Sequence, residues 1–147
     1  MTAPRPDGAP AAAAMTSALR HAGIDASRVD YVNAHGTGTP LNDPAEAAAI
    51  RLALGRRTDT VPVSSVKGAI GHLMAAAGAI EIAATLLAFE RGLLPGTAHL
   101  TELDPEIALD VIGQAPRPAR IGIALSNSFG FGGQNASVVL GRAEGAS

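Results

Sequence analysis

The feature that most constrains the fold is the run GHLMAAAGAIEIAATLLAFERG, residues 71–92, which is apolar on nearly every side of the helix it predicts. A helix that is apolar all round has to be buried on most of its sides, so this one needs other layers of structure around it. Aromatic residues make up only 3% of the chain. The core therefore has to be built from Ala, Val, Ile and Leu, which favour tight contacts between helices and sheets.

The rest of the chain predicts helices and strands in alternation. We expect a helix over 13–22 that stops at Gly23, a strand over 29–34, a helix with Asp43 as N-cap and Pro44 as first residue that ends at Gly55, a strand within 60–67, an irregular stretch over 93–118, and two strands around a glycine-rich loop in 119–141. This order predicts an α/β domain in layers, with its function carried by loops at strand ends. Residues 1–12 are predicted to be a flexible lead-in, 13–141 the domain and 142–147 a tail.

Composition excludes several classes of function. The chain has no cysteine, which rules out disulfides, thiolate metal sites and a cysteine nucleophile on this chain. A formal net charge of −2 offers no basic surface for nucleic acid or an anionic membrane. The first residues do not form a secretory signal and no apolar run is long enough for a membrane span, so a cytoplasmic location is expected. No histidine pair has metal-binding HExxH spacing, so no metal site is expected, and the glycine-rich segments fit neither a P-loop nor a dinucleotide fold.

Three segments at predicted strand ends could carry chemistry. In NAHGTGTP, His35 leaves a strand into a glycine-rich turn, although a lone histidine is more often structural. In VSSVKGAIGHLMAAAGAIE, residues 63–81, His72 is expected at the start of the apolar helix, where the helix dipole favours a neutral imidazole that can donate to a carbonyl oxygen. Glu81 lies inside that helix and needs a partner. Lys67 is the natural one, although the pair could be purely structural.

The third segment is SNSFGFGGQN, residues 126–135. Its backbone N–H groups could form an oxyanion hole. As structure alone, it is a flexible connection between two strands.

Taken together and in this order, the three segments resemble the C-terminal half of β-ketoacyl synthases, the condensing enzymes of fatty-acid and polyketide synthesis. The resemblance runs from about Met15 to Leu140. It implies an acyltransferase whose fold is half of the thiolase-like αβαβα layered arrangement, an α/β fold with a mixed sheet and a buried helix.

The resemblance also implies roles for individual residues. His35 and His72 would hold the thioester carbonyl of a malonyl unit and promote its decarboxylation, each hydrogen bond lowering the barrier by ~3 kcal/mol. Lys67 would organise the site electrostatically and Glu81 would pair with it. Phe131 would be the gating residue whose N–H joins the oxyanion hole. The supporting residues are Gly130, Gly132, Thr37 and Thr39.

Two departures from the family's pattern bear on these expectations. The family's acyl-accepting cysteine lies in its N-terminal half, and nothing in this chain replaces it, since Ser64 and Ser65 belong to no recognisable nucleophile–base arrangement. Gln134 stands where the family often has a smaller or hydroxyl residue. If the rest of the fold is absent, one side of the helix over 72–89 should face water.

Three hypotheses therefore stay open. The chain is the C-terminal part of a ketosynthase that works with a separate cysteine-bearing chain, a non-catalytic binding or regulatory module, or a fragment of a full-length synthase. The expected partners are a complementary N-terminal ketosynthase half or a full synthase, and an acyl carrier protein with phosphopantetheine-linked acyl and malonyl groups. No cofactor is expected.

Overall fold

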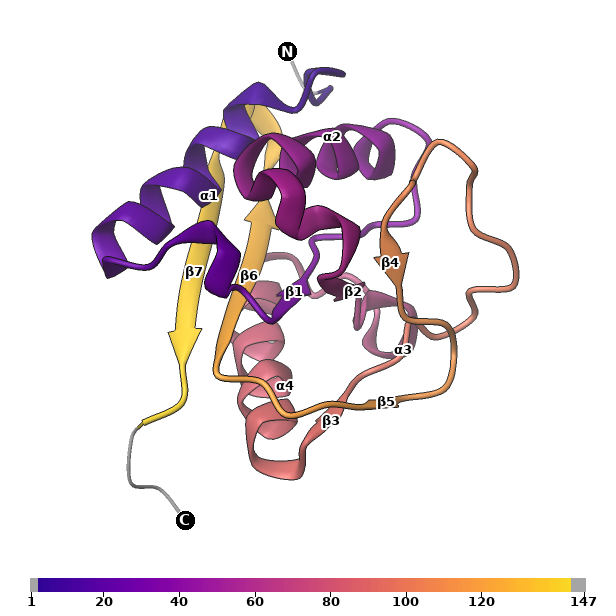
Figure 1. Ribbon diagram of the computed structural model, residues 1–147. Coiled ribbons are helices and arrows are strands. Elements are labelled where there is room, and N and C mark those ends of the chain that lie inside the picture. Colours follow the sequence, from indigo (N-terminus) through magenta and orange to yellow (C-terminus); the bar gives the residue numbers. More distant parts are fainter. Residues whose placement is uncertain (1–2, 144–147) are drawn as a thin grey trace.

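The computed structural model describes residues 3–143, and residues 1–2 of the predicted lead-in and 144–147 of the predicted tail lie outside this range. The longer elements are α1 (Ala9–Ala22), β1 (Tyr31–Asn33), α2 (Asn42–Leu54), β2 (Pro62–Ser64), α3 (Lys67–Ile70), α4 (Ala77–Arg91), β6 (Ile123–Phe129) and β7 (Asn135–Gly141). Short strands β3 (Leu93–Leu94), β4 (Asp110–Val111) and β5 (Arg117–Pro118) lie in the stretch predicted to be irregular. Figure 1 shows their arrangement.

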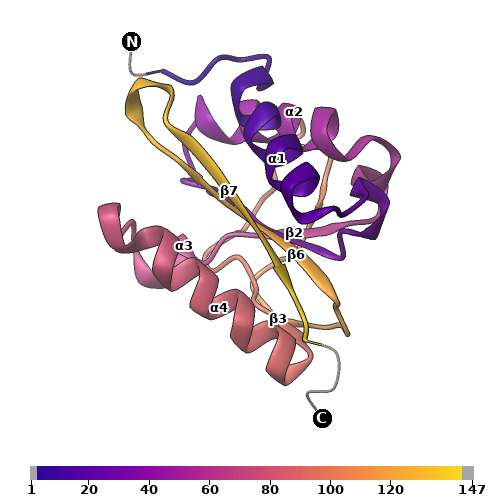
Figure 2. The same cartoon turned by 90° about the vertical axis from the view of Figure 1, so that its left-hand side faces the viewer.

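One sheet organises the molecule. Its strand order is β4-β2-β1-β6-β7, in which β7 runs antiparallel to β6 and the other neighbours are parallel. Helices α1 and α2 cover one face and α4 covers the other (Figure 2). The predicted α/β fold with a mixed sheet is confirmed.

Each face of the sheet has its own apolar core. Side chains alternate between the two faces along a strand. Val32 and Leu125 pack beneath α1 and α2, whereas their strand neighbours Tyr31 and Ala124 pack against α4. At the C-terminal ends of the same strands, polar side chains also alternate between the two faces of the sheet.

The helix predicted over 71–92 is broken. The short helix α3 ends at Ile70 and is followed by Gly71, whose φ is +76°; Met74 also has a positive φ of 50°. The continuous helix, α4, begins only at Ala77. His72 therefore lies in the connection between α3 and α4, and not at a helix start as predicted.

The composition predicted that this helix is buried on most sides, but only one of its faces is buried. The side of α4 that contacts the sheet is buried, whereas Ile80, Leu86 and Leu87 are exposed by 42%, 50% and 54%. The structure thus shows the water-facing apolar side expected of a partial fold. Among residues 3–143, no helix is both long enough and apolar enough to cross a membrane.

Two helix starts also differ from the prediction. Helix α1 begins at Ala9 instead of Ala13, so residues 9–12 of the predicted lead-in are helical. Helix α2 begins at Asn42, whose N–H donates to the Thr39 hydroxyl at 3.4 Å. Asp43 therefore lies in the first turn and is not the N-cap.

Candidate active site

The loop that follows β1, residues 35–40, is held by a buried carboxylate. The backbone N–H groups of His35 and Gly36 donate to the two carboxylate oxygens of Glu46 on α2, at 2.9 and 2.8 Å. Asn127 on β6 donates to the same carboxylate at 3.1 Å. Burial raises the pKa of the Glu46 carboxyl, and these three donors offset part of the rise. We call residues 35–40 the histidine loop.

The two predicted histidines meet at this edge of the sheet. The rings of His35 and His72 lie edge to face, with centroids 5.5 Å apart and planes at 82°. Burial, together with the nearby charges of Lys67 and His72, lowers the pKa of His35 to about 4. The His35 ring is therefore neutral at pH 7.

The orientation of His72 comes from its own loop. Its Nδ1 accepts a hydrogen bond from the backbone N–H of Met74 at 3.1 Å. An imidazole that accepts at Nδ1 carries its proton on Nε2, where it can donate to a ligand. The helix dipole is invoked for His72 on the expectation that this residue starts the helix, whereas α4 begins at Ala77.

The predicted pair between Lys67 and Glu81 is confirmed. The Lys67 ammonium contacts the Glu81 carboxylate, and their side chains are only 6% and 1% exposed. Ser128 on β6 donates its hydroxyl to the second Glu81 oxygen at 3.2 Å. A buried carboxylate in an apolar helix is thus compensated by a charge and a hydroxyl.

The glycine-rich loop connects β6 and β7. Phe131 is 76% exposed in a short turn that includes Gly132, whose φ is +78°. At the base of this turn, the Gly130 N–H donates to the Gln134 carbonyl at 2.8 Å. The gating and oxyanion roles of Phe131, Gly130 and Gly132 stay predictions.

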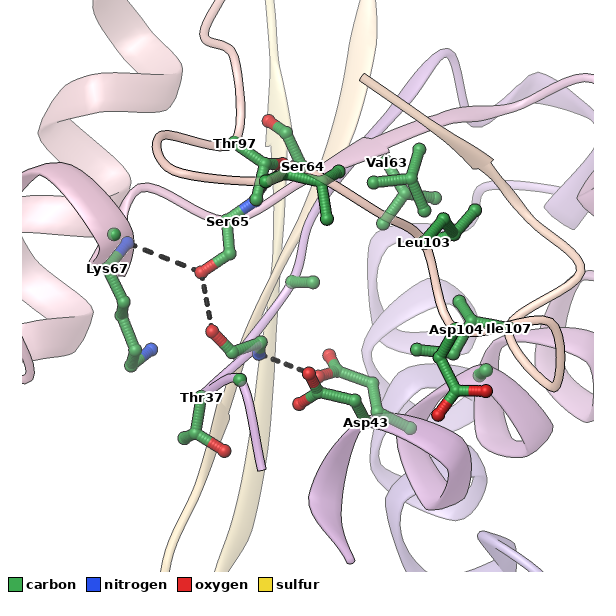
Figure 3. Close-up of a pocket in the computed structure, with 18 of the residues that line it drawn as sticks. Thr37, Asp43, Val63, Ser64, Ser65, Lys67, Thr97, Leu103, Asp104 and Ile107 are labelled. Atoms are coloured by element: carbon green, nitrogen blue, oxygen red, sulfur yellow. Dashed lines mark hydrogen bonds between the residues drawn. The ribbon is translucent and has the colours of Figure 1, made fainter. Parts of the chain in front are cut away.

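A cavity of about 550 Å³ opens beside these groups. Its lining includes Lys67, His72 and Thr37 as well as the apolar side chains of Leu103 and Ile107. Figure 3 shows Thr37 in the histidine loop and Lys67 at the start of α3, both apart from Leu103 and Ile107. The cavity therefore brings the polar side chains of His72 and Lys67 together with apolar side chains.

The predicted supporting threonines both belong to the histidine loop. The hydroxyls of Thr37 and Thr39 lie 2.9 Å apart and are hydrogen-bonded to each other. Together with the Thr39 contact to Asn42, this bond ties the loop to the first turn of α2. Their contribution to a ligand site stays a prediction.

Three polar residues of the site were missed by sequence reasoning: Glu46, Asn127 and Ser128. Glu46 stands in PAEAAA, a carboxylate among alanines. The argument that gave Glu81 a partner applies equally to Glu46, so a signal was present. For Asn127 and Ser128, which were noted only as part of a loop motif, no such signal exists. Within residues 3–143, no three His, Asp or Glu side chains gather as metal ligands would.

Comparison with known proteins finds similarity to β-ketoacyl synthases. Residues 1–101 match the family model described as "Beta-ketoacyl synthase, C-terminal domain". The chain is 45% identical to 3-oxoacyl-[acyl-carrier-protein] synthase 2 of Mycobacterium tuberculosis, covering 97% of this chain and 34% of that protein. It is also 45% identical to the tetracenomycin polyketide synthase ketoacyl synthase alpha subunit of Streptomyces glaucescens, covering 97% of this chain and 33% of that protein.

A solved structure agrees with these sequence matches. It is a type II polyketide ketosynthase in complex with its acyl-carrier protein. This chain superposes on it with a TM-score of 0.95 and 35% identity, covering 98% of this chain and 35% of that one. The chain thus spans about a third of the length of the relatives it matches.

Proposed function

This chain belongs to the C-terminal domain family of β-ketoacyl synthases, and from that premise we propose that it supplies the decarboxylating groups of a condensing enzyme. The observation that carries the proposal is the edge-to-face pair of His35 and His72, whose ring centroids lie 5.5 Å apart and of which His72 lines the cavity. His35 is neutral at pH 7, and His72 is oriented with its Nε2–H available to donate. Two such imidazoles can donate to one carbonyl oxygen.

The proposed substrate is a malonyl thioester on an acyl carrier protein. Its thioester carbonyl oxygen accepts hydrogen bonds from His35 and His72. When the bond to the carboxylate breaks and CO₂ departs, the electron pair moves onto that oxygen as an enolate. Hydrogen bonds aimed at the developing negative charge lower the barrier, by ~3 kcal/mol for one donor. The positive charge of Lys67 lies near His35 and stabilises the same developing negative charge.

Condensation needs one more group. The enolate carbon attacks an acyl thioester, and the thiolate that leaves must come from a cysteine. Since this sequence contains no cysteine, that nucleophile belongs to a complementary N-terminal ketosynthase portion. The exposed apolar side of α4, which includes Ile80, Leu86 and Leu87, is the surface we assign to that portion. The same proposal places the domain in the cytoplasm, with fatty acids or polyketides as products.

The test is a chimera in which this chain replaces the matching C-terminal third of the M. tuberculosis 3-oxoacyl-[acyl-carrier-protein] synthase 2. The chimera should release CO₂ from malonyl-acyl carrier protein. His72→Ala should abolish that release, while transfer of an acyl group to the cysteine of the N-terminal portion persists.

Two results would contradict the proposal. One is a folded chimera that releases no CO₂, which would favour a non-catalytic binding module. The other is a His72→Ala chimera that keeps decarboxylation and loses acyl transfer, because the role assigned to this residue would then be reversed. His21→Ala is a matched control, since His21 lies in the last turn of α1, outside the site.

A further inference from the structure

The hydroxyl of Ser65 lies between the histidine loop and the start of α3, which carries Lys67. Ser65 follows β2 directly, and its side chain is buried. Its Oγ donates to the Gly36 carbonyl at 2.8 Å and accepts from the Lys67 backbone N–H at 3.3 Å. The Lys67 N–H opens α3 and has no acceptor within that helix, so the serine satisfies a group that needs one.

These contacts form a continuous chain of hydrogen bonds. The Gly36 peptide donates its N–H to Glu46 at 2.8 Å and receives Ser65 at its carbonyl oxygen. Figure 3 shows the chain running from Lys67 through Ser65 to the histidine loop and on to a carboxylate. The loop with His35 is thus held by a carboxylate on one side and by a hydroxyl on the other.

The two loops approach each other so closely that there is no room for a side chain at Gly36. A Cβ on Gly36 would lie 2.5 Å from the Ser65 Cβ and 2.9 Å from its Oγ. Gly36 also has a φ of +42°, which favours glycine. A contact of this kind transmits a displacement of one loop to the other.

We propose that Ser65 is a positioning residue, which sets the histidine loop against the turn that carries Lys67 and His72. The inference rests on the proposed function, because it concerns the geometry of that site. Ser65 touches neither substrate nor reacting atoms in this role. It acts through Gly36 on His35 and through the start of α3 on Lys67.

The neighbouring residue offers a matched control. Ser64 is equally a buried serine at the end of β2, and its hydroxyl is hydrogen-bonded to the Tyr31 hydroxyl at 2.8 Å. Ser64→Ala therefore removes one buried hydroxyl and one hydrogen bond from the same strand end. It leaves the link between the two loops intact.

The experiment compares Ser65→Ala, Ser65→Thr and Ser64→Ala in the chimera described above. For Ser65→Ala, the kcat of malonyl decarboxylation should fall between about tenfold and a hundredfold with KM within about twofold, since small misplacements of reacting groups have effects of this size. Ser64→Ala should stay within about twofold of the parent in both kcat and KM. Ser65→Thr keeps the hydroxyl and should stay within about threefold of the parent.

The pH dependence gives a second readout that loss of a merely structural contact would not move. Burial, and after it the charges of Lys67 and His72, keep the pKa of His35 low. When Ser65→Ala lets the two loops separate, the effect of these two charges weakens, the pKa of His35 rises, and the acid side of the pH–rate profile should move to higher pH. In Ser64→Ala it should not move.

The outcomes separate the inference from the function on which it rests. A parent chimera without decarboxylation overturns the proposed function and this inference with it. An active parent in which Ser65→Ala behaves like Ser64→Ala, or changes only KM, overturns the role of Ser65 alone. If Ser65→Ala does not fold, Ser65→Thr decides: a folded, active protein supports the role, and a folded protein slowed tenfold or more contradicts it.

Discussion

The pair between Lys67 and Glu81 makes a prediction that separates stability from function. Both side chains are buried, at 6% and 1% exposure. Lys67→Met leaves the Glu81 carboxylate with the Ser128 hydroxyl as its remaining described side-chain donor. Removing one partner of a buried ion pair typically lowers the free energy of unfolding by about 3–5 kcal/mol, because a charge stays buried without compensation.

The double variant should behave differently. Lys67→Met with Glu81→Leu replaces both charges by apolar side chains of similar volume, and such replacements are often neutral or stabilising by about 1–4 kcal/mol. The loss in the double variant should therefore be smaller than in either single variant. Yet it should release no CO₂ from the malonyl thioester, because the lysine charge near His35 is gone.

The assay is urea unfolding of the chimera and of the three variants, with decarboxylation measured on the same samples. The control is the pair between Arg5 and Asp7, whose side chains are 62% and 52% exposed. Breaking that pair should leave the free energy of unfolding nearly unchanged, because exposed ion pairs contribute little to stability. The reasoning fails if Lys67→Met costs no more than this control, or if the double variant loses as much as the two single variants summed.

Three further predictions concern other parts of the site. Glu46→Gln should lower the free energy of unfolding by about 1–3 kcal/mol in urea titrations. The side-chain NH₂ group of the glutamine faces a backbone N–H, so that one donor is left unpaired. An unchanged unfolding midpoint would contradict this. Since burial holds the pKa of His35 at about 4, below the unfolded value near 6.5, the stability it contributes is complete above pH 6.5 and is lost as pH falls toward 4. In unfolding titrations between pH 6.5 and 4, His35→Asn should therefore lose less free energy of unfolding than the parent. Leu86→Lys with Leu87→Lys should make the isolated chain run at monomer mass in gel filtration, whereas the parent and the control Glu90→Gln self-associate.

Much of the fold was predictable because local signals agreed with the tertiary structure. Gly23 and Gly55 end helices where their positions predicted, and each adopts a positive φ. The break before α4 was not predictable in the same way. Residues 73–76, LMAA, are good helix formers, and nothing local in them stops a helix. The connection between α3 and α4, which carries His72, is thus set by tertiary context.

The meeting of the two histidine segments follows from strand pairing. β1 and β2 are parallel neighbours with Asn33 opposite Ser64. Their C-terminal ends therefore lie at the same edge of the sheet, and the loops that follow begin side by side. The sequence motifs identified which residues occupy these loops. The contact between Gly36 and Ser65, by contrast, depends on the register of the pairing, which the short strands do not reveal.

Strand β6 explains how two buried carboxylates come to serve one site from opposite sides of the sheet. Successive strand residues point to opposite faces. Asn127 contacts Glu46 on α2, and the next residue, Ser128, contacts Glu81 on α4. Figure 2 shows these helices on the two faces. The first carboxylate fixes the histidine loop and the second fixes Lys67, so each face supplies one half of the site. Because the sheet lies between them, the two carboxylates need a separate contact to keep their halves in register. The Ser65 hydroxyl, at the edge where the faces meet, provides that contact.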